Sequence, residues 1–498
     1  MLKNNTIKSE RKKSNLSKSH KSYKDSIKKH FDKLSQSRES WIRKASGFYE
    51  EDILMMREFV PENSRVLEIG TGNGHLLSSL KPSYGVGIDI SKKMIELAKK
   101  NYDYLTFING DIENSYCLKK VEGKFDFIIL SDTVGYFYDI EKAFENLHTV
   151  CKADTRLIVA YYSPYWEPLL NLAILLKLKM PELPKALLSE EDIATLLKTS
   201  GYETVRKEKK IIFPFKFYGI TRFLNRFLSP LPILSSLCLR HYVVSRSLRE
   251  FSNELPKSAS IIIPCRNEKG NVRAALDSLP KFTDNIEVIF VEGHSNDGTW
   301  NEIQKVVKDK NYTNKSFVLK AIQQSGHGKA DAVFKAFSIA SNDVLMILDG
   351  DLTVAPEDLT KFWKKISNGE AEYINGTRLL YPMENSAMFF LNYIANRLFS
   401  ILFSWLLGQR YTDTLCGTKV LQRKHYQKLS KINSELGSFD PFGDFFIIFG
   451  ASKLNLKMIE VPIHYRARTY GETQISRFSH GLLLIKMVVL AFLKLKAI

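Results

Sequence analysis

Short apolar runs alternate with helix-length segments from Trp41 to about Ala160. Four of these runs are expected to be buried parallel strands: VLEI (66–69), GVGIDI (85–90), FDFIIL (125–130) and RLIVAYY (156–162). Runs of this length, bounded by turn residues and alternating with helical segments, are typical of an open α/β sheet. Residues 163–248 are very apolar but less regular, so their elements are harder to assign.

A second series of apolar runs begins at residue 260. Its expected strands are SIIIP (260–264), EVIFV (287–291), FVLKAI (317–322) and VLMILD (344–349). The polar, proline-bearing stretch FSNELPKSA separates the two series, which share no motif that would indicate a duplication. The sequence therefore predicts two Rossmann-like α/β domains, at residues 41–248 and 259–498, joined by a linker at 249–258.

Length and composition agree with two globular domains. The chain has 498 residues, of which 44% are hydrophobic and 25% charged, and this excludes a largely disordered or fibrous protein. The five cysteines form neither a disulfide framework nor a CxxC pair, which argues against a thiol-ligated zinc site and fits a reducing cytoplasm. The opening residues, MLKNNTIKSERKK, contain no apolar stretch, so no signal peptide is expected.

The net charge of +18 is concentrated near the N-terminus. Residues 1–44 contain 14 Lys/Arg and 4 Asp/Glu, which is more than half of the excess. We expect residues 1–40 to be a basic, flexible tail, because segments rich in lysine, serine and asparagine cannot bury an apolar face. Contact with anionic lipid or with nucleic acid is an alternative use of this charge.

The first chemical motif is the glycine-rich turn VLEIGTGNGHLL. It places Gly70, Gly72 and Gly74 after a strand and before a helix, where glycines let the backbone approach a ligand at the helix N-terminus. Asp89 follows about 20 residues on, at the end of the next strand, and is placed to bind ribose hydroxyls. A GxGxxG dinucleotide fingerprint would need glycine at position 75, and His75 there argues against NAD or FAD.

These motifs resemble those of the class I S-adenosylmethionine-dependent methyltransferases, over residues 30–248. FDFIILSDTVGYF resembles the fourth-strand motif of that family, and LLSEEDIATLLKTSGYETV resembles its late helix and strand. The resemblance implies an N-terminal methyltransferase sheet that binds S-adenosylmethionine, with Asp89 on the ribose and Asp111 on the adenine side. The cofactor-binding residues that it implies are Glu68, Gly70, Gly72, Gly74, Asp89, Ile90, Asp111 and Ile112.

The methyl acceptor is expected to be a small or lipid-linked molecule. No NPPY-like motif follows the fourth strand, so methylation of nucleic acid is disfavoured and no nucleic-acid partner is expected. Asp132, Tyr136 and Tyr138 lie near the expected transfer pocket, but tyrosines at such positions more often pack than catalyse. The sequence therefore assigns no general base to this domain.

The second chemical motif is ILDGDLT, which puts Asp349 and Asp351 at the end of an apolar strand. Two carboxylates at this spacing can hold Mg²⁺ or Mn²⁺ together with a diphosphate, although such strings also occur in solvated loops. In context, SIIIPCRNEKGNV, VEGHSNDGTWNEI and ILDGDLT resemble, in order and spacing, the inverting family-2 glycosyltransferases of the GT-A fold. The resemblance implies that a nucleotide sugar, linked to UDP or GDP, binds at Pro264, Asn267, Glu268, Glu292, Asp297, Lys329, Asp349 and Asp351, with Asp349 and Asp351 as metal ligands.

One position departs from that family's pattern. The second strand usually ends in two aspartates, and this chain has Val291 and Glu292. Glutamate keeps the charge with a longer reach, so contact with the nucleotide is expected to survive while base preference stays open.

Downstream segments resemble the polyprenyl-phosphate sugar transferases, the branch that includes dolichyl-phosphate mannose synthase. The resemblance assigns the acceptor phosphate to Arg378 and to a late arginine, either Arg466 or Arg468, because guanidinium groups bind phosphate bidentately. Where the branch often has a further arginine this chain has Phe389 or Phe390, and Arg397, two helical turns on, is a candidate replacement.

Candidate catalytic residues of this second domain are Asp413, Asp444 and Arg378. Either aspartate could instead be a capping or loop carboxylate. The base is left open because a phosphate acceptor is already anionic and needs positioning more than deprotonation.

Two apolar segments bear on membrane association. Residues 387–408 are long enough to span a bilayer, but Asn392, Asn396 and Arg397 in mid-run favour an interfacial helix. The C-terminal QISRFSHGLLLIKMVVLAFLKLKAI is basic and apolar, which is typical either of a helix on anionic lipid or of a core-packed terminal helix. We expect a cytoplasmic protein that associates peripherally with the anionic cytoplasmic face of a membrane.

Taken together, the sequence predicts a bifunctional enzyme. One domain would transfer a sugar from a nucleotide sugar to a polyprenyl phosphate or lipid-linked glycan, and the other would methylate a substrate of the same cell-envelope pathway. One alternative is that one domain has lost its chemistry and serves as a binding scaffold. Another is a nucleic-acid-modifying enzyme, which the basic tail suggests.

Overall fold

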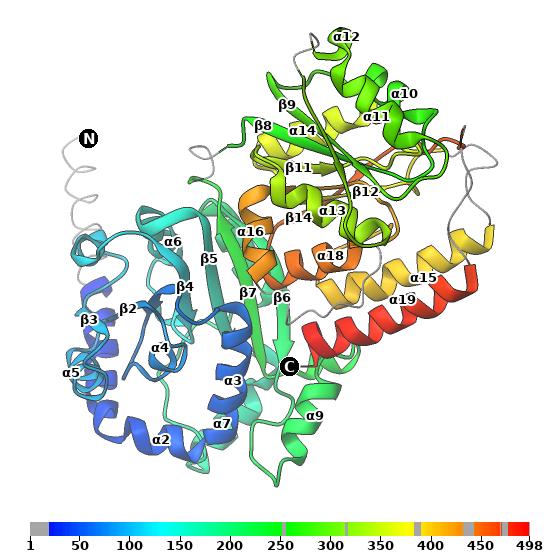
Figure 1. The fold of residues 1–498 in the computed structure, drawn as a ribbon. Coiled ribbons are helices and arrows are strands. Elements are labelled where there is room, and N and C mark those ends of the chain that lie inside the picture. The colour runs from blue at the N-terminus through cyan, green and yellow to red at the C-terminus, as the bar shows by residue number, and fades with distance from the viewer. Residues whose placement is uncertain are drawn as a thin grey trace, which may run out of the picture. The chain divides into compact units, whose positions relative to one another are not determined.

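A computed structural model of the protein describes residues 19–250, 255–313, 317–382, 390–431, 443–468, 470 and 477–497. The chain divides into two compact units, Met1–Asn253 and Glu254–Ala497, each built on its own sheet (Figure 1). The division falls inside the stretch 249–258 that was predicted as a linker, of which residues 251–254 lie outside the described residues.

The described part of the first unit has a seven-stranded sheet in the order β3-β2-β1-β4-β5-β7-β6. Its strands are β1 Arg65–Ile69, β2 Tyr84–Asp89, β3 Thr106–Asn109, β4 Phe125–Ser131, β5 Cys151–Tyr162, β6 Tyr202–Lys210 and β7 Arg240–Ser247. β7 runs antiparallel to both of its neighbours, while the pairs from β3 to β5 are parallel. The four apolar runs predicted as strands are β1, β2, β4 and β5.

Helices cover both faces of this sheet. They are α2 Arg38–Lys44, α3 Ser46–Phe59, α4 His75–Ser79, α5 Lys92–Asn101, α6 Ile140–Leu147, α7 Glu167–Leu175, α8 Glu190–Thr199 and α9 Ile220–Leu228. Val66 of β1 packs with α3, α4 and α5, whereas its neighbour Leu67 packs with α6 and α8. Because successive strand residues point to opposite faces, an unbroken apolar run such as VLEI suits a strand buried on both sides.

Residues 19–40 differ from the flexible tail that was expected. Residues 19–34 form a helix, and Ile27 and Leu34 are buried. Asp32 fixes this helix to α5, since its Oδ1 accepts hydrogen bonds from Ser91 Oγ at 2.6 Å and from Lys93 N at 3.1 Å. The expectation was wrong here because lysines dominate the composition, while the apolar residues recur at helical spacing and do bury one face.

The described part of the second unit also has seven strands in one sheet, ordered β10-β9-β8-β11-β13-β12-β14. They are β8 Ser258–Cys265, β9 Asn285–Glu292, β10 Phe317–Gln323, β11 Val344–Ile347, β12 Tyr373–Thr377, β13 Lys419–Gln422 and β14 Met458–Pro462. β13 is antiparallel to β11 and β12, and the other pairs are parallel. The four predicted runs are β8, β9, β10 and β11, so both predicted α/β sheets are confirmed.

Two helical layers enclose this second sheet (Figure 1). The helices are α10 Asn271–Ser278, α11 Thr299–Lys308, α12 Lys310–Thr313, α13 Gly328–Ile339, α14 Leu359–Ser367, α15 Phe390–Leu407, α16 Arg423–Lys431, α18 Asp444–Lys453 and α19 Arg477–Ala491. On β8, Ile262 packs with α13, α15, α18 and α19, whereas Ile261 and Ile263 pack with α10, α11 and α14.

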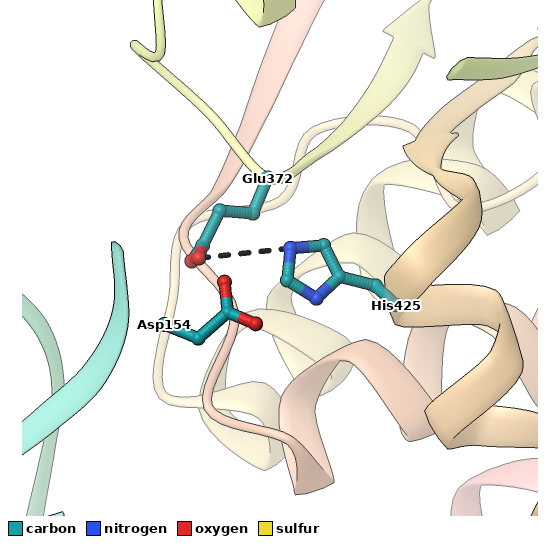
Figure 2. Close-up of side chains that lie close together, drawn as sticks. All are labelled: Asp154, Glu372 and His425. Carbon is teal, nitrogen blue, oxygen red and sulfur yellow. Dashed lines mark ion pairs between the residues drawn. The ribbon is translucent and has the colours of Figure 1, made fainter. Parts of the chain in front are cut away.

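A buried ion pair ties α16 to the start of β12. His425 Nε2 lies 3.7 Å from Glu372 Oε1, and both side chains are almost fully buried (Figure 2). Glu372 Oε2 also accepts the backbone N–H of Lys457 at 2.8 Å, next to β14. The pair therefore holds the far edge of the sheet in place.

The two segments considered for membrane association become α15 and α19. Each buries one side in the core, as Phe403 and Met487 show, and leaves apolar side chains such as Ile401 and Ile485 exposed on the other. Within the residues that the structure describes, neither of these helices nor any other is long and apolar enough to cross a membrane. Phe389, discussed above for the acceptor, lies outside the described residues.

Candidate functional sites

A cavity of about 610 Å³ opens at the carboxyl ends of β1, β2 and β4 in the first unit. Of the residues predicted to bind the methyl donor, those that line it are Glu68, Gly70, Gly72, Asp89, Ile90, Asp111 and Ile112. Gly74 does not; it precedes α4 with a positive φ, and a Cβ there would lie 2.7 Å from Phe107 Cζ. The structure thus brings seven of the eight residues to one cavity.

The glycine-rich turn forms the floor of this cavity. Gly70 has φ +73°, and a Cβ at this position would overlap Thr133 Oγ1, so only glycine fits. Two residues on, the backbone N–H of Gly72 donates to Asp89 Oδ2 at 2.8 Å. The turn and the acid at the end of β2 therefore form one hydrogen-bonded unit.

Two acids, the buried Glu68 and the partly exposed Asp89, stand at the strand ends beside the turn. Glu68 accepts a hydrogen bond from Thr71 Oγ1 at 2.7 Å, and burial raises the pKa of its carboxyl to about 8. Asp89 accepts from the backbone N–H groups of Gly72 and Ser91, each at 2.8 Å, while burial raises its pKa as well. In both cases desolvation outweighs the hydrogen bonds.

The N-terminal segment supplies a wall of the cavity that the sequence did not predict. Lys24 forms ion pairs with Asp111 and, at 3.2 Å, with Glu113 Oε2. Arg38 donates to Tyr49 Oη at 3.0 Å and also lines the cavity. The signal that could have revealed this segment is the helical spacing of its apolar residues: Tyr23, Ile27, Phe31 and Leu34.

A charged network lies at the other end of the cavity, beyond β4. Asp132 has φ +57° and pairs with Arg240, whose fully buried guanidinium also lies 2.9 Å from Asp52 Oδ1. Burial raises the pKa of Tyr136 far above its usual value, so its hydroxyl stays protonated. Asp132, partly exposed to the cavity, is the carboxylate of this network best placed to meet an acceptor.

In the second unit, the two aspartates of the DGD turn follow β11 and are each held by a cation. Lys329, in the first turn of α13, places Nζ 2.6 Å from Asp349 Oδ1. Arg468 Nη2 lies 2.5 Å from Asp351 Oδ2. Lys329 holds the pKa of Asp349 below its usual value although the carboxyl is desolvated.

Asp349 also lies against the loop that begins at the predicted catalytic residue Asp413. A Cβ at Gly417 would overlap Asp349 Oδ2, so the backbone between Asp413 and Lys419 passes directly against the carboxylate. Lys419 Nζ lies 3.4 Å from Asp444 Oδ1, at the first position of α18. Asp444 thus belongs to the charge cluster around Asp349, together with the two lysines.

The predicted nucleotide-binding residues gather at the ends of β8 and β9. Glu268 is buried, accepts from Asn271 Nδ2 at 2.6 Å and lies 3.8 Å from Arg468 Nη1. Burial raises the pKa of Glu268 to about 7. Arg468 therefore spans Glu268 and Asp351, and connects the β8 turn with the DGD turn.

The other residues of this group shape the turns themselves. Asn267 has φ +57° and accepts the N–H of Asn296 at 2.9 Å. Asp297 accepts the N–H groups of Lys269 at 3.1 Å and Thr299 at 3.0 Å. Pro264 pairs with Val291 across β8 and β9, and Glu292, at the end of β9, is buried and accepts the N–H of Ser295 at 2.5 Å.

Arg378 and Asp413 form a two-pronged ion pair. Nε donates to Oδ2 at 2.7 Å and Nη2 to Oδ1 at 2.9 Å, and Asn396 of α15 donates to the same carboxylate at 2.8 Å. Arg378 lowers the pKa of Asp413 to about 2, and the side chain of Asp413 has no exposed surface. In this arrangement Asp413 holds Arg378, whose guanidinium lies 5.1 Å from the centre of the Tyr465 ring, and cannot itself touch an acceptor.

The remaining predicted arginines are dispersed. Arg397 contacts Tyr393 of the same helix, with Nε 3.4 Å from Oη. Arg466 is exposed, and its backbone N–H donates to Thr353 O at 2.9 Å. Of the two late arginines between which the sequence could not choose, only Arg468 contacts the DGD turn within the described residues.

Comparison with known proteins identifies both domains. Residues 61–210 match the family model described as methyltransferase domain, and residues 260–429 match that of glycosyl transferase family 2. An uncharacterized methyltransferase of Bacillus subtilis is 32% identical over 115 residues, which are 22% of this chain and 44% of that protein.

Two archaeal proteins match the second unit. The dolichol-phosphate mannosyltransferase of Pyrococcus furiosus is 28% identical over 128 residues, covering 24% of this chain and 34% of that protein. The UDP-N-acetylglucosamine–dolichyl-phosphate N-acetylglucosaminyltransferase of Methanococcus voltae is 27% identical over 220 residues, covering 41% of this chain and 83% of that protein. The chain thus spans about a third of the first relative and most of the second.

Solved structures align with each unit separately. Magnesium protoporphyrin IX methyltransferase from Synechocystis, with bound S-adenosylmethionine, is 16% identical with a TM-score of 0.31, covering 45% of this chain and 97% of its own. Glucosyl-3-phosphoglycerate synthase from Mycobacterium tuberculosis is 14% identical with a TM-score of 0.35, covering 48% of this chain and 80% of its own. By its two family matches, the chain joins a methyltransferase domain at residues 61–210 to a glycosyl transferase family 2 domain at residues 260–429.

Proposed function

We propose that the protein is a bifunctional enzyme of lipid-linked glycan assembly. Its second unit transfers a sugar from a UDP- or GDP-sugar to a polyprenyl phosphate, and its first unit methylates the product or a neighbouring intermediate. We place the domains at 41–248 and 259–498. The single observation that carries the proposal is the meeting of Asp349, Asp351, Lys329 and Arg468 at the end of β11, since this cluster has the charges that a nucleoside diphosphate with its cation requires.

The residues of this cluster fit a divalent cation. Asp349 and Asp351 offer carboxylate oxygens, which Mg²⁺ and Mn²⁺ prefer, and both are only partly exposed. A cation bound there would neutralise charge on the leaving nucleoside diphosphate. Lys329 and Arg468 would then turn from the carboxylates towards the phosphates, and Gly417, which has no side chain, leaves room for Asp349 and Lys329 beside it.

The acceptor phosphate is assigned to Arg378, with Arg468, Arg466 and Arg397 as further candidates. Arg378 is the best placed, because Asp413, which also accepts a hydrogen bond from Asn396, holds its guanidinium in one orientation before any ligand arrives. A phosphate is already anionic at neutral pH, so the reaction needs no strong base in this unit. Asp444 then serves to orient Lys419 and Lys329, which its carboxylate faces.

The methyl donor is assigned to the cavity of the first unit. The residues fit S-adenosylmethionine: the Gly70–Gly72 turn leaves room for a ligand, and Asp89 stands at the ribose position with backbone partners on its inner side. Asp111 is assigned to the adenine side, where Lys24 now contacts it. Asp132 and Arg240 would orient the acceptor at the other end.

The proposed acceptor implies work at a membrane surface. A polyprenyl phosphate lies in a bilayer, so we place the enzyme on the cytoplasmic face, held peripherally by anionic lipid. No nucleic-acid partner is part of the proposal.

The test of sugar transfer offers labelled UDP- and GDP-sugars with polyprenyl phosphate and Mn²⁺. Label should enter the organic-extractable lipid with the wild type and be lost with Asp351→Asn. The matched control is Asp284→Asn, whose carboxyl is 96% exposed, and this variant should keep full transfer. Absence of labelled lipid with intact nucleotide binding would contradict the proposed acceptor.

A further inference from the structure

Two segments of the first unit present an apolar surface to solvent. One is α7 with the residues that follow it, 165–178, and the other is the connection 215–237 between β6 and β7. The exposed apolar side chains of these segments include the following, with their exposed fractions: Leu172 49%, Leu175 77%, Phe217 54%, Tyr218 93%, Phe223 62% and Ile233 84%. We call this the apolar surface; a group of large apolar side chains of this size on a globular unit indicates an interaction site.

This surface is not an ordinary amphipathic face turned to the core. In α7, EPLLNLAIL, apolar residues occupy every side of the helix, and none of its residues is buried. In α9, Phe223 and Ile220 point outward, whereas the polar residues Thr221 and Asn225 are the buried ones. The usual arrangement of a soluble helix is therefore reversed here.

The two segments lie together at the mouth of the methyl-donor cavity. Trp166, just before α7, donates from Nε1 to Leu237 O at 2.9 Å. Leu170 and Leu178 of the first segment and Phe215 of the second line the cavity itself. The outer faces of the same segments form the apolar surface, so whatever covers it also lies at the entrance of the cavity.

Charge indicates what covers it. Residues 215–237 contain Lys216, Arg222 and Arg226 and no acidic residue, and residues 165–178 contain Lys177 and one acid, Glu167. Of these cations, Lys216 pairs with Glu50 of α3 at 2.6 Å. Apolar side chains interspersed with more cations than acids match the boundary between acyl chains and anionic headgroups. A protein partner would need an apolar surface with acids of its own, whereas an anionic bilayer offers both features without a specific shape.

We infer that the apolar surface inserts into an anionic bilayer and brings the mouth of the cavity to the lipid. The methyl acceptor of the first unit is then a membrane-borne molecule whose polar head enters between α7 and residues 213–217. This inference rests on the proposed methyl-donor site of the same unit. It does not depend on the membrane contacts of the second unit.

The test uses the full chain with single introduced cysteines. The five native cysteines are all buried, so an environment-sensitive thiol dye reports the introduced position. Leu175→Cys and Phe217→Cys probe the apolar surface, and Tyr104→Cys and Tyr116→Cys, at 65% and 61% exposure, are matched controls in the same unit. On vesicles of phosphatidylcholine with phosphatidylglycerol, the dye should shift to the blue at 175 and 217 and not at 104 and 116.

Other outcomes overturn the inference. If the chain floats with the vesicles while the dye at 175 and 217 does not respond, another part of the chain makes the contact. A shift without lipid that grows with protein concentration would assign the surface to a second copy of the chain. An equal response at all four positions would mean unspecific adsorption.

A charge arm completes the test. The double variant Arg222→Gln, Arg226→Gln should bind these vesicles about 30-fold more weakly at low salt, because each basic residue near the surface contributes about a fivefold factor. Its binding to vesicles of phosphatidylcholine alone should not change. S-adenosylhomocysteine binding, measured by calorimetry, should be the same in every variant as in the wild type. If the wild type does not bind S-adenosylhomocysteine, the proposed methyl-donor site is contradicted, whereas the vesicle result is unaffected.

Discussion

The two units each hold desolvated acids at their candidate sites but neutralise them differently. In the methyltransferase unit, Glu68 and Asp89 are held by a hydroxyl and by backbone N–H groups, and burial raises the pKa of both. In the glycosyltransferase unit, Asp349 and Asp413 are held by Lys329 and Arg378, which lower their pKa values. Desolvated acids thus show opposite pKa shifts, depending on whether the partner carries a charge.

The difference corresponds to the ligands proposed for each unit. An acid held by neutral donors keeps lone pairs for the hydroxyls of a ribose. An acid held by a cation forms part of a cluster in which the charges cancel. When a diphosphate and a metal ion bind there, the metal ion can take the place of the lysine or arginine at the carboxylate, and the lysine or arginine can pair with the diphosphate. Two acids depart from this pattern. In the first unit Asp111 pairs with a cation, Lys24, and in the second unit the pKa of Glu268 is raised although Arg468 lies beside it.

The largest effect is expected from removing the cation at the most buried acid. Arg378→Ala leaves the Asp413 carboxylate buried without its guanidinium, which should lower the free energy of unfolding of the second unit by about 3–5 kcal/mol. Arg273→Ala, at an exposed pair with Glu302, is the matched control and should cost less than about 1 kcal/mol. Urea unfolding measures both, and equal losses would show that the buried pair with Asp413 contributes no more than an exposed pair.

The pH dependence of this pair has a defined sign. The folded-state pKa of Asp413 is about 2, below its usual 3.8, so the wild type keeps this stabilisation above pH 4 and loses it as the pH falls towards 2. In Arg378→Ala the pKa of Asp413 should rise. The difference in free energy of unfolding between the wild type and the variant should therefore shrink as the pH falls and Asp413 is protonated.

The next effect concerns the cation at Asp349. Lys329→Met should reduce kcat/KM for sugar transfer by about 100-fold, because a group that contacts the diphosphate and orients Asp349 is lost. Lys305→Met, at an exposed lysine of α11, should leave the rate unchanged. Full activity of Lys329→Met would show that the Lys329–Asp349 pair is only structural.

In the first unit, the corresponding change is Asp89→Asn. The amide NH₂ of the variant would face the backbone N–H of Gly72 or Ser91, so two donors would lie opposite each other. Affinity for S-adenosylhomocysteine should therefore fall about 10- to 50-fold. Asp103→Asn, an exposed acid after α5, is the control. Calorimetry gives both constants, and an unchanged value for Asp89→Asn would remove Asp89 from the site.

A smaller effect is expected at Glu68, where no ligand is needed to observe it. The folded-state pKa of Glu68 is about 8, against a usual 4.5. As the pH rises between these values, the unfolded chain loses this proton before the folded chain does, so the free energy of unfolding falls. Glu68→Gln keeps the shape and cannot ionise. Between pH 5 and 9, the free energy of unfolding of the variant should rise by about 1–2 kcal/mol relative to that of the wild type. Thermal unfolding at several pH values measures this. A difference that does not change with pH would mean that Glu68 is already ionised at pH 5.

The smallest effect concerns the N-terminal helix. Lys24→Ala removes the pairs with Asp111 and Glu113 and should weaken S-adenosylhomocysteine binding about two- to fivefold, by loosening the wall of the cavity. Lys28→Ala, exposed on the same helix, should have no effect. Tighter binding by Lys24→Ala would instead mean that Lys24 competes with the ligand for Asp111.

The parts of the protein that could be predicted are local in sequence. The runs that became β1, β2, β4, β5 and β8–β11 stand out because a strand buried on both faces needs continuous apolar residues. The three glycines, Asp89 and the DGD acids follow such strands directly, so their place at the sheet edge was predictable. The N-terminal helix was missed because its lysines conceal an apolar stripe, and β12–β14 were missed because polar residues interrupt their short apolar runs.

The sequence by itself determined two α/β sheets and which acids stand at their edges, since strand burial and tight turns depend on neighbouring residues. Only the tertiary structure decided the partners of those acids. Arg468 and Asp351 are 117 positions apart, Lys24 and Asp111 are 87, and Gly417 meets Asp349 from another strand connection. Such pairs form where the packing of distant elements brings charges together away from water, and no local periodicity encodes that meeting.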